Sequence, residues 1–204
     1  IILSCLNSLE RLQTNYVDLY YIHKQNKNFN VKDICQALNF LLKKGLIKNV
    51  GLSNVSIKTI KEYNKYLIKK VYAVQNQYNL VCRESKKKGI IEYCQKNNIK
   101  FICWRPLLLS YPNCKDPMYK KGTYPILDYL AKKYKVSNVQ IVAKWILQQD
   151  NIYMVFKSNN CKHIREILDT DKFKLSDEEW NELNENFPIM FDMGCATNEF
   201  YEIE

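Results

Sequence analysis

The sequence is poor in glycine and proline, with five of each among its 204 residues. This composition excludes collagen-like and low-complexity disordered chains. No glycine-rich G-x-G-x-x-G segment follows any of its apolar runs, which argues against a Rossmann dinucleotide-binding domain. No run of 18 or more apolar residues occurs, and the first residues do not form a signal-peptide pattern, so the sequence predicts no membrane-spanning helix.

Metal-binding patterns are also missing. The eight cysteines are irregularly spaced, none of them forms a C-x-x-C pair, and the only histidines are His23 and His163. We therefore expect no metal site. Several cysteines fall inside apolar runs, as small buried side chains do. This usage predicts free thiols in a reducing compartment, and hence a cytoplasmic protein.

Acidic residues are fewer than basic ones, 21 against 31, which leaves a net charge of +10. Such a charge can bind a polyanion, and that alternative predicts salt-sensitive binding to nucleic acid. However, the only tight basic run is 86–88, and no recognition motif accompanies it. We expect no nucleic-acid partner, and a cationic surface would still attract a phosphate-bearing ligand.

What the sequence does contain is a regular alternation of helix and strand patterns. Short apolar runs predict five strands, and the segments between them carry apolar residues at helical spacing. Strands separated by helices are typical of parallel β/α units. No shift in composition marks a linker, so we expect a single domain over residues 1–204. The predicted strands cover 16–22, 49–52, 71–74, 99–104 and 152–156.

Among parallel folds, a (β/α)8 TIM barrel fits best, although five strands are too few to close one. The sequence therefore predicts an incomplete barrel. An open barrel exposes unpaired strand edges, so self-association is expected if the barrel stays open.

Several local signals set the predicted helix ends. Asn30 is a predicted N-cap, and Gly45 ends the helix that Asn30 begins. The pairs Ser137–Gln140 and Ser176–Glu179 have the spacing of capping boxes.

Polar side chains follow the first three predicted strands directly. His23 follows 16–22, Ser53 and Asn54 follow 49–52, and Gln75 follows 71–74. Because strand–helix enzymes collect their chemistry where the strands end, these four residues form a candidate site. Taken alone, His23 would more often be an ordinary core or surface histidine, and Ser53–Asn54 an ordinary helix cap and turn.

Six segments together carry a family resemblance. They occur in order as SLERLQ (8–13), VDLYYIH (17–23), GLIK with VGLSN (45–54), VQNQYN (74–79), WRPL (104–107) and FKSN (156–159). On these segments the chain resembles the aldo-keto reductases, nicotinamide-dependent (β/α)8 oxidoreductases. The resemblance covers residues 1 to about 187 and corresponds to the last five strands of that barrel.

The resemblance implies a role for each candidate residue near the nicotinamide. His23 would be catalytic, because it would hydrogen-bond the substrate carbonyl oxygen and polarise it for hydride attack. Ser53, Asn54 and Gln75 would hold the nicotinamide carboxamide, since side chains of this kind supply both donors and acceptors. Trp104 would stack on the nicotinamide ring; core packing is its alternative.

The resemblance also implies contacts to the phosphates and the adenine. The segment with Arg105 and Leu107, which continues to Ser110, would lie along the pyrophosphate, although its residues depart from the family pattern. The motif of Lys157, Ser158 and Asn159 would hold the adenosine 2′-phosphate near a helix start. Glu166 would contact the adenine, and His163 stands where the family has an arginine. NADP(H) is therefore the expected cofactor, with NAD(H) as the alternative.

The implied function is NADP(H)-dependent reduction of an aldehyde or ketone. The family's catalytic Asp, Tyr and Lys come from strands before the matched segments, so we expect the chain to begin partway through the barrel and to be inactive as this fragment. The alternative is a non-catalytic regulatory or interaction protein derived from such a reductase. Substrate choice would reside in loops such as 110–124 and in the tail after Phe187, which the motifs do not identify.

Overall fold

The computed structural model describes residues 1–24, 30–107 and 124–187. Within the described residues, the contacts divide the chain into two compact units. The first unit contains residues 1–76 and 89–101, and the second contains 77–88 and the residues from 102 onward. The expected single domain over 1–204 stays a prediction.

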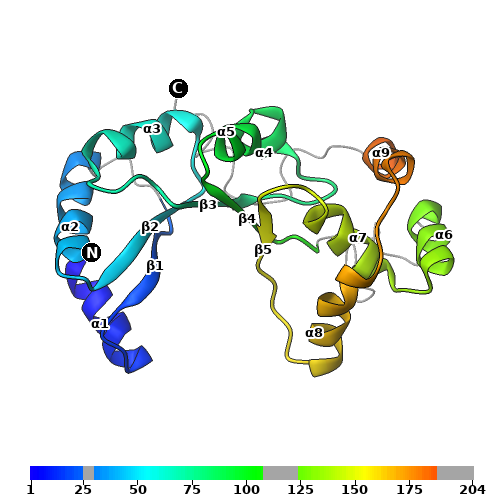
Figure 1. Ribbon diagram of the computed structural model, residues 1–204, viewed down its shortest axis with the longest axis horizontal. Coiled ribbons are helices and arrows are strands. Elements are labelled where there is room, and N and C mark those ends of the chain that lie inside the picture. Colours follow the sequence, from blue (N-terminus) through cyan, green and yellow to red (C-terminus); the bar gives the residue numbers. More distant parts are fainter. Residues whose placement is uncertain (25–29, 108–123, 188–204) are drawn as a thin grey trace. The chain divides into compact units, whose positions relative to one another are not determined.

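Five strands form one sheet in the order in which they occur in the sequence. Helices separate the strands, as the alternating patterns predict (Figure 1). The pairs whose register is known are parallel, which confirms the parallel α/β prediction. The strands are β1 (Val17–Ile22), β2 (Ile47–Ser53), β3 (Ala73–Gln77), β4 (Lys100–Trp104) and β5 (Ile152–Met154).

The first unit is built around β1, β2 and β3. Its helices are α1 (Ile2–Leu12), α2 (Val31–Lys43), α3 (Ile57–Tyr66) and α5 (Ile90–Lys96). Helix α2 packs against α1, α3 and β2 (Figure 1). It buries Cys35, Leu38 and Leu41, which recur at helical spacing along one face of the helix.

The start and end of α2 confirm the local sequence signals. The side chain of Asn30 accepts a hydrogen bond from the Lys32 amide at 2.8 Å, which satisfies one free donor of the first turn. Beyond the helix, Gly45 has a φ of 70°, a left-handed conformation that glycine adopts without steric cost. These two residues therefore set the ends of α2 through interactions with residues that are close in the sequence.

The second unit is mainly helical around β5. Helix α7 packs against α6, α8, β5 and the 3₁₀ turn η2. Both predicted capping boxes are present, Ser137 with Gln140 at α7 and Ser176 with Glu179 at α9. The elements of this unit are α4 (Glu84–Lys87), α6 (Pro125–Tyr134), α7 (Asn138–Leu147), α8 (Cys161–Leu168), η2 (Asp169–Lys172) and α9 (Asp177–Asn186).

The strands differ in extent from the sequence-based prediction, most clearly β2, β3 and β5. Strand β2 begins at Ile47, two residues before its predicted start at 49, and β5 ends at Met154, two residues before the predicted end at 156. Strand β3 continues through three polar residues, Gln75, Asn76 and Gln77, beyond the predicted end at Val74. The prediction ended β3 before its first polar residue, but Asn76 and Gln77 are buried in the fold, at 0% and 1% exposure. Polarity therefore did not mark the end of this strand.

Among the described residues, no helix combines the length and the apolar character needed to cross a membrane.

Candidate functional site

The strand register of the first unit aligns three of the predicted site residues. Ile22 pairs with Leu52 across β1 and β2, so the next residues, His23 and Ser53, continue the same alignment. Ser53 pairs with Gln75 across β2 and β3. His23, Ser53 and Gln75 therefore form one row across three adjacent strands, at the ends of β1 and β2 and two residues before the end of β3, which we call the amide row.

Hydrogen bonds link the amide row to Asn54. The Ser53 hydroxyl donates to the Gln75 carbonyl oxygen at 2.9 Å. The Asn54 side-chain amide donates to the Ser53 hydroxyl at 3.2 Å and to the His23 carbonyl oxygen at 3.3 Å. The four residues that sequence reasoning selected in this part of the chain are therefore brought together by contacts between side chains and main chain.

The side chains of the amide row differ in exposure. Ser53 is 3% exposed, Gln75 is partly buried and His23 is exposed. Asn54 has a φ of 58°, in the left-handed region that few residues other than glycine adopt. Such a conformation at a strand end is typical of functional positions because the surrounding contacts must hold it.

A second row lies one pleat earlier on the same three strands, formed by Tyr21, Gly51 and Ala73. The Tyr21 ring covers Gly51 closely: a Cβ atom built there would lie 2.6 Å from Cδ1 and 2.8 Å from Cζ of the ring. Since side chains two residues apart on a strand share a face, Tyr21 lies under the amide row. We call Tyr21, Gly51 and Ala73 the floor row.

The hydroxyl of Tyr21 is buried, and within the described ranges it has no hydrogen-bond partner. Burial raises the pKa of this phenol to about 12. Tyr21 is thus a neutral aromatic group beneath the candidate site. Sequence reasoning missed it because it treated the tyrosine as one more residue of an apolar strand; the glycine two residues before Ser53 was the available signal.

The second unit carries the remaining predicted residues. Trp104 ends β4 and is partly buried, and the Arg105 guanidinium lies 5.8 Å from the centre of its ring. Arg105 has a φ of 50°, and its carbonyl oxygen accepts a hydrogen bond from the Asn79 side chain at 3.0 Å. Asn79 is the last residue of the motif 74–79, but the sequence alone did not indicate that its side chain holds the main chain of Arg105.

Leu107 occupies the core of the second unit. It is 2% exposed, so its side chain packs inward and does not face a phosphate. The predicted pyrophosphate segment continues to Ser110, and its last three residues lie outside the described residues, as does most of the segment 110–124.

The predicted 2′-phosphate site lies between β5 and α8. Lys157 and Asn159 are exposed, while the Ser158 hydroxyl accepts from the Asn160 amide at 3.1 Å. The Asn160 side chain accepts from the Lys162 main-chain amide at 2.9 Å and so caps α8.

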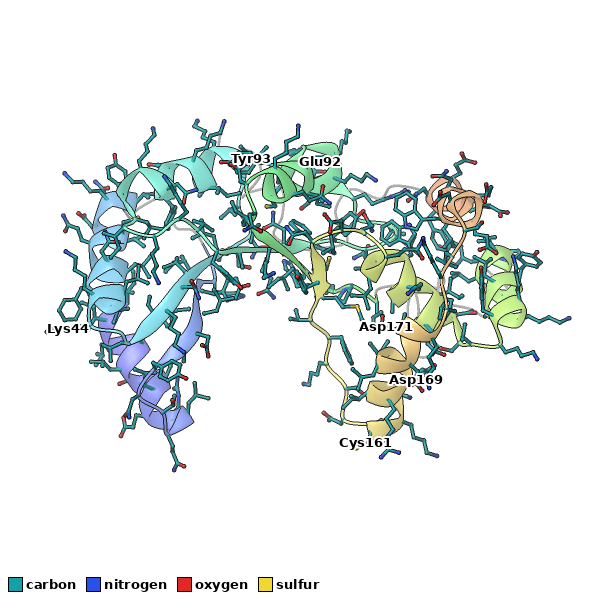
Figure 2. The ribbon with its side chains drawn as sticks, in the orientation of Figure 1. Lys44, Glu92, Tyr93, Cys161, Asp169 and Asp171 are labelled. Carbon is teal, nitrogen blue, oxygen red and sulfur yellow. The ribbon has the colours of Figure 1, made fainter. Side chains whose placement is uncertain are left out.

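Along α8, His163 is exposed, and its Nε2 lies 3.4 Å from the side-chain nitrogen of Asn160. Glu166 is partly buried, one turn further along the same helix. Figure 2 shows Cys161 at the first turn of α8, next to this cap. Cationic and polar groups therefore surround the start of α8, where main-chain N–H groups favour an anion.

Metal binding has no support in the described part of the chain. There, no three His, Cys, Asp or Glu side chains come close enough together to hold an ion. The donor sets present are amides, hydroxyls and lysine or histidine at strand ends and at a helix start. In the first unit these groups suit a carboxamide, and in the second unit they suit a phosphate.

Comparison with known proteins shows the family of this chain. The model of the Aldo/keto reductase family matches residues 1–186. An uncharacterized oxidoreductase of Schizosaccharomyces pombe is 33% identical over 181 residues, covering 88% of this chain and 55% of its own length. Glyoxal reductase of Bacillus subtilis is 30% identical over 177 residues, covering 87% of this chain and 59% of its own. The chain thus spans little more than half the length of these relatives.

Solved structures show the same fold. The thermostable aldo-keto reductase Tm1743, solved with the inhibitor epalrestat, matches with a TM-score of 0.81 and 30% identity, over 89% of this chain and 64% of that one. An aldo/keto reductase of Klebsiella pneumoniae, solved with NADP and acetate, matches with a TM-score of 0.78 at 20% identity, over 92% and 65% of the two chains. These matches confirm the predicted fold, which is part of a (β/α)8 barrel. The chain belongs to the aldo/keto reductase family.

Proposed function

We propose that this chain binds NADP(H) and positions a carbonyl substrate for hydride transfer in the reduction of an aldehyde or ketone. The observation that carries the proposal is the hydrogen-bonded arrangement of His23, Ser53, Asn54 and Gln75 across three adjacent strands. These residues carry amide and hydroxyl groups of the kind that a carboxamide needs, and His23 is exposed.

The residues present fit the cofactor at its nicotinamide end. Gln75 is only partly buried, and its side-chain amide carries both a donor and an acceptor for a carboxamide. Bound NADPH would supply the hydride. Hydrogen bonds from Gln75, Ser53 and Asn54 would fix the carboxamide, and so determine which face of the nicotinamide ring meets the substrate.

His23 would act on the substrate. Its imidazole would donate a hydrogen bond to the carbonyl oxygen, on which negative charge develops as the hydride arrives. The proton that this oxygen finally takes up has no assigned donor among the residues of the amide row. Removing a proton donor typically costs about 10²–10⁴-fold in rate, so the chain by itself would bind the cofactor and turn over slowly or not at all.

At the adenosine end, Lys157 and the start of α8 support NADP(H) over NAD(H). A lysine and free main-chain N–H groups favour the extra phosphate. Among the described residues six cysteines are free, which fits a reducing compartment such as the cytoplasm.

Fluorescence titration with NADPH tests the proposal, together with turnover of a generic aldehyde by the same preparation. Saturable NADPH binding that is tighter than NADH binding is expected. Absence of binding by the folded chain would refute the proposal.

A second candidate, a cofactor-binding protein without catalysis, is favoured by Arg105, whose guanidinium approaches the Trp104 ring on which a nicotinamide would stack. Binding without turnover, in a chain shown to be complete, would support this second candidate.

A further inference from the structure

Strand β3 turns two neighbouring amide side chains to opposite faces of the sheet. Gln75 shares a face with Ser53, with which it is in register. Asn76 follows it and therefore projects from the other face, since side chains alternate along a strand. Asn76 is 0% exposed, so water does not reach it and its amide needs partners within the protein.

Both partners of Asn76 belong to a single residue. Its side-chain oxygen accepts a hydrogen bond from the Val55 main-chain N–H at 3.0 Å. Its side-chain nitrogen donates to the Val55 carbonyl oxygen, also at 3.0 Å. Val55 is itself 0% exposed, so without Asn76 both of its peptide groups would lose their hydrogen bonds in a buried place.

These two hydrogen bonds continue the pairing of β2 with β3 beyond Ser53 and Gln75, the last residues in register. The Asn54 main-chain N–H donates to the Gln75 carbonyl oxygen at 3.0 Å. The next N–H, that of Val55, is held by Asn76. The peptide groups on both sides of Asn54 are therefore fixed to β3, and with them the left-handed φ of 58° that Asn54 adopts.

We infer that Asn76 is a positioning residue for the nicotinamide end of the cofactor site. This inference rests on the proposed function, because the cofactor is the NADP(H) proposed there. Asn76 does not touch the cofactor; it holds Val55, and through Val55 it orients Asn54 toward Ser53 and His23. A residue with an apolar side chain at this position would leave Asn54 free to adopt an ordinary conformation and lose that orientation.

The test uses Asn76→Leu, which keeps the size of the side chain and removes both hydrogen bonds. Asn39→Leu is the matched control. Asn39 makes the same kind of paired contact elsewhere in the first unit, because it donates to the Tyr66 carbonyl oxygen at 2.8 Å and accepts from the Ile68 N–H at 3.0 Å. Each variant loses two hydrogen bonds to the main chain, but only those of Asn76 lie next to the amide row.

Two ligands separate positioning from a general loss of stability. NADPH reaches the amide row, whereas 2′-phospho-ADP-ribose has the same adenosine and phosphates but no nicotinamide. In Asn76→Leu we expect NADPH binding to weaken about tenfold, a loss of the size that one or two hydrogen bonds to the ligand produce. Binding of 2′-phospho-ADP-ribose should stay unchanged, and Asn39→Leu should bind both ligands like the parent chain.

Amide hydrogen exchange gives a readout that needs no ligand. The Val55 N–H should exchange faster in Asn76→Leu than in the parent chain and in Asn39→Leu. If Asn76→Leu does not fold, Asn76→Ala replaces it, since this variant also removes both hydrogen bonds to Val55 and adds no bulk at the buried position. The same selective weakening of NADPH binding is then expected, at about tenfold.

The possible failures are distinguishable. If the parent chain binds neither ligand, the proposed function is refuted and the inference with it. If the parent chain binds NADPH and the folded Asn76 variant binds it equally well, or loses both ligands equally, the positioning role is refuted while the proposed function stands.

Discussion

Gly51 lies where any larger residue would collide with the Tyr21 ring. The two residues are directly paired across β1 and β2, and the next residue of the row, Ala73, is also small. The floor row is therefore one large side chain lying over small neighbours, and it supports the amide row above it. The requirement for glycine here is one of space, since the φ of Gly51 is not among the positive values.

Gly51→Ala should destabilise the chain by about 1–3 kcal/mol, the usual cost of overpacking. The reason is the 2.6 Å approach of the new Cβ to Tyr21 Cδ1. Urea unfolding measures this change. Replacing Tyr21 by Leu in the same variant should restore part of the loss, and a double variant no more stable than Gly51→Ala would show that the ring is not the cause.

Lys157 is the residue from which the proposed preference for NADP(H) is argued. Lys157→Ala should weaken NADPH binding by roughly tenfold, the size of one charge-assisted contact, and leave NADH binding unchanged. Titration with both cofactors measures the ratio. Lys172→Ala is the control, because Lys172 pairs with Asp169 at 2.7 Å on the exposed turn η2. An equal loss for both cofactors in Lys157→Ala would contradict the assignment.

At the scale of elements, one buried side chain anchors the end of α9. The Arg83 guanidinium donates to the Asn184 carbonyl oxygen at 2.9 Å and to the Phe187 carbonyl oxygen at 2.7 Å. Asn184 in turn accepts through its side chain from Arg83 and from the Trp145 indole. A cation at the C-terminal end of a helix satisfies carbonyl groups that have no partner within the helix.

Arg83→Leu should lower the free energy of unfolding by about 2–3 kcal/mol, because buried carbonyl groups of α9 would lose a charged donor. The fluorescence of Trp145 and Trp180, which stack at 5.9 Å between ring centres, reports the change during urea unfolding. Lys172→Ala again serves as the exposed control, with an effect below about 0.5 kcal/mol. Equal effects of the two substitutions would argue against the anchoring role.

At the scale of the whole molecule, both units bury free thiols. Burial, together with the charge of Glu62, raises the pKa of Cys35 to about 11, and burial alone raises that of Cys94 to about 12. Burial also raises the pKa of Cys103 well above its usual value. All three thiols are therefore held neutral by the fold, although they lie on different elements.

The chain should lose stability at alkaline pH. A thiol ionises near pH 9 in the unfolded chain but only near 11 or 12 when buried, so between these values the unfolded state binds fewer protons and is favoured. The loss in the free energy of unfolding should be absent below about pH 9. Above that pH it should reach about 1 kcal/mol per pH unit for each deeply buried thiol. Urea midpoints at pH 8 and pH 10.5 under reductant measure it.

The exposed Cys161 provides the control for this prediction. Cys161→Ser should keep the alkaline loss, whereas Cys94→Ala should reduce it. A stability that does not change between the two pH values would contradict the prediction.

Much of the fold could be predicted because its signals are local. The caps at Asn30, Ser137 and Ser176 lie within four residues of the groups they bind, and the alternation of apolar runs predicts the parallel sheet. The site residues His23, Ser53, Asn54 and Gln75 could be selected because strand ends and motifs are visible in the sequence. Their proximity in the first unit follows from parallel pairing, which the alternation also predicts.

By itself, the sequence determined the helix starts at Asn30, Ser137 and Ser176, which runs become strands and which polar residues stand at the ends of β1 and β2, because each depends on neighbours a few residues away. Only the tertiary structure decided that Tyr21 covers Gly51, that Asn76 holds Val55 and that Leu107 turns into the core. These contacts depend on the register between strands some 20 to 30 residues apart and on which face of a strand is covered. A shift of one residue in that register would exchange the faces, and local patterns do not set it.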